Sequence, residues 1–135
     1  MAAARGPRAP LLPGLDEQSA RRLEARVVRR TVRAGEVLMR EGEPIRELVF
    51  VATGELEVLK REKHHRQREH RIARVSAGEV CGELELTDGQ PAAATVRAAV
   101  ASVIYALPLD SRDPELDRAL QRHFSRLLAA RLRGK

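Results

Sequence analysis

Residues 35–44 read GEVLMREGEP, a short apolar run with glycine and charged residues on both sides. Residues 48–51 (LVFV) and 54–58 (GELEV) continue the pattern, so that short apolar segments alternate with Gly-Glu turns. Glycine suits such chain reversals because it adopts positive φ angles without steric strain. This spacing predicts short antiparallel strands rather than long helices or a parallel sheet.

The same pattern extends in both directions and predicts about eight short strands. We expect them at residues 28–33, 37–40, 47–52, 55–60, 71–75, 79–81, 94–98 and 102–107. A helix that Asp16 can cap precedes them, and a helix of residues 113–133 follows, with an apolar stripe formed by Leu116, Leu120, Phe124, Leu127 and Leu128. The expected fold class is mainly β with flanking helices: a double-stranded β-helix, or jelly roll, barrel over residues 27–109 with an N-terminal and a C-terminal helix.

The chain has 135 residues, of which 43% are hydrophobic and 2% aromatic. This length suits a single domain with an aliphatic core, and we place that domain at residues 15–135. Residues 1–14 contain three prolines and no acidic residue, so we expect a flexible arm rather than a signal peptide, with an organellar transit peptide as the alternative. Cys81 is the single cysteine, which excludes an internal disulfide and favours a buried, small apolar role.

The formal charge is +6, and 22 of the 25 basic residues are arginines. Residues 60–74 alone hold seven basic and two acidic residues between two expected strands, which is typical of a solvated hairpin tip. We expect no metal site at His64, His65 and His70, because no carboxylate–histidine or cysteine motif accompanies them. With so few aromatic residues, we also expect no stacking platform for single-stranded nucleic acid.

The chain resembles the cyclic nucleotide-binding domain family, which includes the catabolite activator protein and the regulatory subunit of cyclic-AMP-dependent kinase. The Gly-Glu turns quoted above resemble the first half of that domain. Residues 82–86 (GELEL) and 91–98 (PAAATVRA) look like its phosphate-binding cassette, a short helix and loop between two strands. The resemblance covers residues 12–132 and implies the same jelly-roll barrel.

The resemblance assigns ligand-binding roles to Gly82, Glu83, Leu84, Ala92, Ala93 and Thr95. Backbone N–H groups at the start of the cassette helix would hold a phosphate, and Glu83 would accept a hydrogen bond from a ribose hydroxyl or, alternatively, from backbone amides. The family uses an arginine at the position of Ala92, and often serine or threonine at Ala93. Losing a hydrogen bond to a charged group costs about 1.5–3 kcal/mol, so we expect weakened binding of a cyclic phosphate.

The local charge supports the same expectation. Residues 75–109 contain one basic and four acidic residues, and one of these, Glu85, stands where the family commonly has a small residue. Arg97 could replace the missing arginine only if it faced the pocket. Strand alternation puts Arg97 and Val96 on opposite faces, and the sequence leaves open which face is the pocket.

The resulting hypothesis is a non-enzymatic, cytoplasmic regulatory module without a resident cofactor. Its ligand would be cyclic AMP, cyclic GMP or a related anion, bound with weakened affinity. Its terminal helix would pack on the barrel, or pair with a protein partner or a second copy of the chain. The alternative is a ligand-free scaffold that binds an acidic protein, lipid or nucleic-acid surface through residues 60–74.

Motifs that would indicate other functions are not found in the sequence. We find no catalytic motif, and the longest apolar stretch, residues 98–109, is too short to span a membrane as a helix. Family members that act on DNA carry a helix-turn-helix domain after the terminal helix, whereas here only residues 134–135 follow the expected helix. We therefore expect no sequence-specific DNA binding, although the arginines of the hairpin and helix could still contact phosphates.

Overall fold

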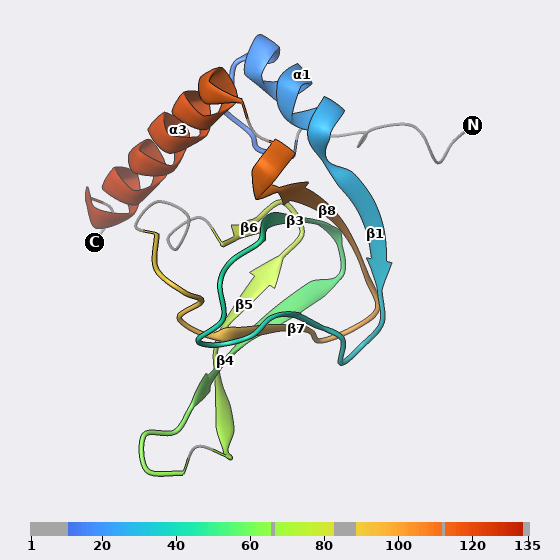
Figure 1. Ribbon diagram of the computed structural model, residues 1–135, viewed down its shortest axis with the longest axis vertical. Helices are drawn as coiled ribbons and strands as arrows, with labels where there is room; N and C mark the ends of the chain where they lie inside the picture. Colours follow the sequence, from blue (N-terminus) through green and yellow to red (C-terminus); the bar gives the residue numbers. More distant parts are fainter. Residues whose placement is uncertain (1–10, 66, 83–88, 112, 134–135) are drawn as a thin grey trace.

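A computed structural model describes residues 11–65, 67–82, 89–111 and 113–133 (Figure 1). Each of the eight expected strands is present, with ends within two residues of those expected. In chain order the elements are α1 (Glu17–Arg26), β1 (Val28–Val32), β2 (Val37–Met39), β3 (Glu47–Thr53), β4 (Glu55–Arg61), β5 (Glu69–Ser76), β6 (Val80–Cys81), β7 (Thr95–Ala98), β8 (Ser102–Pro108), the short 3-10 helix η2 (Leu109–Ser111) and α3 (Pro114–Arg133).

The strands form two antiparallel four-stranded sheets that face each other, in the orders β1-β8-β3-β6 and β2-β7-β4-β5. Each strand contributes at least one side chain to the apolar core between the sheets: Val32, Met39, Val49, Val51, Leu56, Val75, Cys81, Val96, Ala98 and Ile104. This arrangement confirms the expected jelly-roll barrel with helices on its N-terminal and C-terminal sides. Cys81 is buried on β6, as expected.

A second core lies between the first sheet and the helices. On β3, Val49 and Val51 point into the barrel, whereas Leu48 and Phe50 belong to the second core. Both faces of this strand are therefore buried, which explains why residues 48–51 are apolar without alternation. The helices contribute Leu23 of α1 and the stripe residues Leu116, Leu120 and Phe124 of α3.

Two carboxylates fix the helices. Asp16 caps α1 by accepting a hydrogen bond from the backbone N–H of Ser19, as expected. Asp113 accepts from the N–H of Leu116 at 2.7 Å and pairs with Arg26 at 2.8 Å. The hydrogen bond from Leu116, helped by the nearby arginines, lowers the pKa of the Asp113 carboxyl. Since Arg26 lies at the end of α1, this pair ties the two helices together.

The expected flexible arm over residues 1–14 is wrong for Leu11 and Leu12. Leu11 and Leu12 are buried in the second core, and the chain then turns at Gly14, whose φ is +94°. The prolines of this segment exclude a helix, and the sequence therefore suggested a free arm. Packing the two leucine side chains against the helix layer is nevertheless favourable, because it removes their apolar surface from water. Residues 1–10 lie outside the described residues.

Candidate functional site

Gly82 leaves β6 at the point where the predicted cassette begins. Its φ is +98°, and a Cβ atom there would lie 3.1 Å from Met39 Cε and 3.3 Å from the Glu47 carbonyl oxygen. Both the backbone conformation and the close approach of β2 and β3 therefore require glycine. The predicted ligand residues Glu83 and Leu84, and Glu85, lie outside the described residues.

Ala92 lies in the arm that leads from the predicted cassette into β7. Its side chain is buried, with 4% exposed, and its backbone is held by the turn between β2 and β3. The Ala92 N–H donates to the Glu43 carbonyl at 2.9 Å, and its carbonyl accepts from the Gly42 N–H at 2.8 Å. At this position, therefore, the N–H already has a partner and the side chain is a methyl group without charge.

Ala93 and Thr95 are held by a polar network that the sequence does not reveal. The Lys60 ammonium donates to the Ala93 carbonyl at 2.5 Å and lies 3.6 Å from the Glu41 carboxylate. Glu41 also donates its backbone N–H to the Thr95 hydroxyl at 3.0 Å, and its carboxylate accepts from the Arg61 N–H at 3.0 Å. The structure thus brings Thr95 and Ala93 together with Lys60 and Glu41, neither of which sequence reasoning selected.

Arg97 lies on the outside of the barrel. Val96 points into the core, so alternation along β7 turns Arg97 outward, where it forms a two-point ion pair with Glu57 on β4. Its Nη2 and Nε atoms lie 2.8 and 2.9 Å from the same Glu57 oxygen. This answers the question that the sequence left open: Arg97 is on the face away from the core and is already paired.

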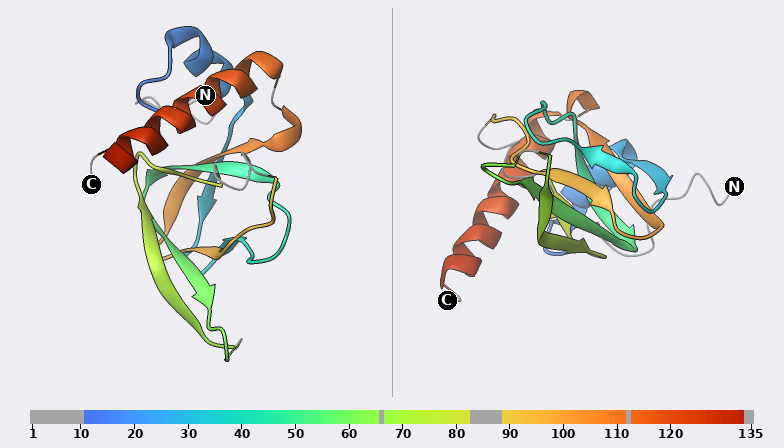
Figure 2. Two further views of the ribbon diagram at one scale, coloured as in Figure 1. Left: turned by 90° about the vertical axis from the view of Figure 1, so that its left-hand side faces the viewer. Right: turned by 90° about the horizontal axis from the view of Figure 1, so that it is seen from below.

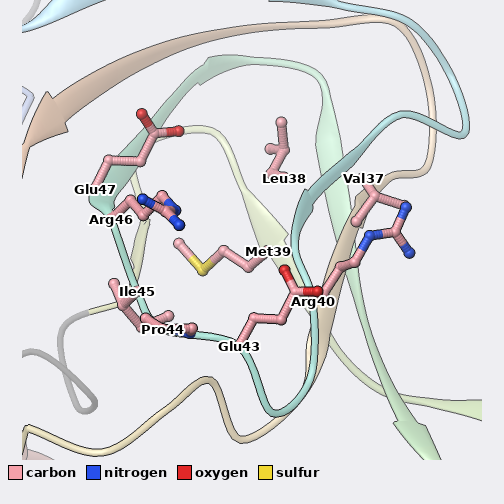
Figure 3. Close-up of a pocket in the computed structure, with 9 residues that line it drawn as sticks. All are labelled: Val37, Leu38, Met39, Arg40, Glu43, Pro44, Ile45, Arg46 and Glu47. Carbon is pink, nitrogen blue, oxygen red and sulfur yellow. The ribbon is translucent and has the colours of Figure 1, made fainter.

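An open pocket of about 300 Å³ adjoins the start of the cassette (Figure 3). Figure 3 shows Met39 extending from β2 toward Ile45 on the opposite wall, next to Arg46. Arg40 and Arg46 also line this pocket, and no ion pair within the described part of the chain engages either guanidinium. Because Gly82 packs on Met39 and Glu47, the pocket shares a wall with the point where the cassette segment leaves β6.

The described residues contain no cluster of three metal-ligating side chains, and His64, His65 and His70 are exposed around the hairpin. No helix in the described ranges has the length and apolar character needed to cross a membrane.

Comparisons with known proteins found one family model and several solved structures that match this chain. The family model described as "Cyclic nucleotide-binding domain" matches residues 29–118. No curated protein matches the chain. Among solved structures, the N-terminal domain of a transcriptional regulator from Streptomyces coelicolor A3(2) is 30% identical, with a TM-score of 0.73 and 91% of each chain covered.

Two further structures share the barrel but are longer proteins. The catabolite activator protein of Thermus thermophilus is 25% identical with a TM-score of 0.76, and the match covers 93% of this chain and 59% of that protein. A triple mutant of the regulatory subunit of a cAMP-independent protein kinase A from Trypanosoma brucei, bound to cAMP, is 22% identical with a TM-score of 0.76. That match covers 90% of this chain and 42% of the subunit, and at this identity it shows the fold alone.

The family match spans the barrel from β1 to the first turn of α3, including the segment between β6 and β7 where the sequence predicts the cassette. The chain belongs to the cyclic nucleotide-binding domain family.

Proposed function

We propose that this chain is a non-enzymatic regulatory module whose pocket binds cyclic AMP, cyclic GMP or a related anionic ligand with weakened affinity. The fold and the family membership support the proposal of a regulatory role. The proposal of weakened affinity concerns the predicted cassette, where Ala92 stands at the position of the family's phosphate-binding arginine.

The observation that carries the weakened affinity is the environment of Ala92. The buried methyl group offers no hydrogen-bond donor, and its backbone N–H is engaged by the Glu43 carbonyl. A phosphate at this position would lose the two-point, charge-assisted contact that an arginine makes.

The neighbouring cations Arg97 and Lys60 are not free to replace the missing arginine as a phosphate contact. Arg97 is paired with Glu57 on the outside of the barrel, and Lys60 is engaged by the Ala93 carbonyl and Glu41. Glu41 also adds a carboxylate close to the arm. These contacts between protein groups hold the arm in place, so that no ligand phosphate is needed to fix it. They therefore favour a barrel that is fully formed without ligand.

The output of such a module would pass through α3. Leu116, Leu120 and Phe124 anchor its first half on the second core, and its arginines at positions 118, 122 and 126 remain exposed. A protein partner or a second copy of the chain would then contact the outer face of α3, so a ligand that moves α3 would change that contact.

Calorimetric titration of the full chain with cyclic AMP and cyclic GMP tests the proposal. We expect a Kd weaker than about 10 μM for both, because one charge-assisted contact is missing. No heat at millimolar ligand would overturn the sensing role, and a much tighter Kd would overturn the weakened site.

A substitution series then tests the reason for weak binding. Ala92→Arg is expected to tighten binding about 10- to 100-fold, whereas Ala92→Gln, which is polar but neutral and shorter, is not. Gln67→Arg adds the same charge to the exposed hairpin between β4 and β5, away from the arm, and serves as the positional control. Equal affinities for folded Ala92→Arg and Ala92→Gln would show that the pocket does not place a phosphate next to residue 92.

A further inference from the structure

The hairpin between β4 and β5 extends beyond the barrel as a free two-stranded ribbon. β4 pairs with β7 only from Leu56 to Leu59, but it pairs with β5 as far as Arg61. From Lys60 to His70, therefore, β4 and β5 have only each other as strand partners among the described residues. Figures 1 and 2 show this ribbon projecting from the end of the barrel opposite to α1 and α3.

The ribbon is polar throughout and strongly basic. Residues 60–71 read KREKHHRQREHR and contain no apolar residue. Ion pairs with the body of the barrel engage Lys60, through Glu41, and Arg74, through Glu55. Within the described ranges, no ion pair engages the side chains of four further cations, and all four residues are exposed: Arg61, Lys63, Arg68 and Arg71. These cations are therefore available to an external anion.

We propose that the described residues of the β4–β5 ribbon, 60–65 and 67–71, bind the phosphate backbone of double-stranded DNA without sequence specificity. A two-stranded β-ribbon fits the major groove of B-form DNA, which is about 12 Å wide. Arginines and lysines on both strands of the ribbon would then face the phosphates on both sides of the groove. This inference does not depend on the pocket and goes beyond the proposed ligand-sensing function.

The chemistry of the ribbon favours duplex DNA over the other acidic surfaces. Membrane insertion needs apolar or aromatic side chains at the tip, and the ribbon has none. Single-stranded nucleic acid needs exposed aromatic rings, whereas Phe50, Tyr105 and Phe124 are all buried in the second core. Duplex RNA has a major groove that is too narrow and deep for such a ribbon.

The test is fluorescence anisotropy of a labelled DNA duplex with the full chain over a series of salt concentrations. We expect one phosphate contact from each of the four unpaired cations of the ribbon, Arg61, Lys63, Arg68 and Arg71. Four contacts predict a slope of log K against log salt of about −4. The double variant Arg68→Gln/Arg71→Gln should reduce that slope by about two and weaken binding at low salt at least about tenfold. Arg29→Gln/Arg33→Gln removes the same charge from two exposed positions on and just after β1 and should change the affinity by less than about twofold.

Three results would overturn the proposal. The first is the absence of any anisotropy change with duplex DNA at the lowest salt concentration. The second is an equal loss of affinity for the ribbon variant and the Arg29/Arg33 variant, because binding would then follow net charge rather than the ribbon. The third is tighter, ribbon-dependent binding to phosphatidylserine vesicles or to polyglutamate than to duplex DNA, since the ribbon would then be a site for a membrane or an acidic protein. Circular dichroism of each variant checks that the barrel is intact.

Discussion

Replacing Gly54 by alanine tests how closely the β3–β4 turn packs against the start of β8. Gly54 has a φ of +95°, and a Cβ atom there would lie 2.1 Å from Ser102 Oγ and 2.8 Å from Ser102 Cα. Ser102 is buried, accepts from the Glu55 N–H at 3.1 Å and donates to the Val100 carbonyl at 2.8 Å. The serine cannot move aside without breaking these hydrogen bonds, and its Cα cannot move without displacing β8.

Gly35 provides a matched control for the magnitude. Its φ is +89°, close to that of Gly54, but a Cβ atom there would meet nothing within 4 Å. Gly35→Ala should therefore lower the free energy of unfolding by about 1–2 kcal/mol, the cost of a left-handed conformation for an L-residue. Gly54→Ala has the same conformational cost. It should lose about 1–3 kcal/mol more, because the added methyl group overpacks the site and disrupts the hydrogen bonds of Ser102.

Urea unfolding followed by circular dichroism measures both variants against the parent chain. We expect Gly54→Ala to be less stable than Gly35→Ala by about 1–3 kcal/mol with an unchanged m-value. Equal losses for the two alanine variants would refute the argument, because the conformational cost alone would then account for both.

The remaining predictions concern α3, the β7 arm and a buried histidine. Leu120→Ala should lower the free energy of unfolding by about 2–5 kcal/mol in urea titrations, because Leu120 is fully buried, whereas the exposed Gln121→Ala on the same helix should change it little. Thr95→Val keeps the side-chain shape but removes the hydroxyl that accepts a backbone N–H, so thermal unfolding should show a loss of about 1–3 kcal/mol, and no loss would show that water replaces the hydroxyl. Burial, helped by a nearby arginine, lowers the pKa of His123 below its ordinary 6.5; the unfolded chain therefore binds the proton more readily, and stability should fall as the pH drops below 6.5. His123→Gln should flatten this pH dependence and exposed His70→Gln should not; identical profiles for the two variants would contradict the assignment.

Local signals were sufficient to predict the barrel. The glycine-punctuated apolar segments located all eight strands, and the carboxylate of Asp16 marked the start of α1. Such features act between residues that are close in sequence, where turn geometry and capping determine the backbone. The apolar stripe of α3 likewise indicated which face would be buried, and Leu116, Leu120 and Phe124 confirm it.

The contacts of the site could not be predicted in this way, because they join residues that are far apart in the chain. The hydrogen bond of Thr95 to the N–H of Glu41 spans 54 positions, and that of Lys60 to Ala93 spans 33. No periodicity or turn signal encodes such pairs. The burial of Leu11 was missed for a related reason, since its partners belong to elements that come together only in the folded chain. The ligand-binding roles assigned by resemblance, including those of Glu83 and Leu84, stay predictions.

The central claim is that this cyclic nucleotide-binding barrel has a weakened phosphate site because residue 92 is alanine. Parallel calorimetric titrations of the parent chain and Ala92→Arg with cyclic AMP test it most directly. The account predicts a parent Kd weaker than about 10 μM and a gain of about 10- to 100-fold in the arginine variant. A nanomolar parent Kd, or no gain in an Ala92→Arg variant that retains the parent's circular dichroism, would contradict it.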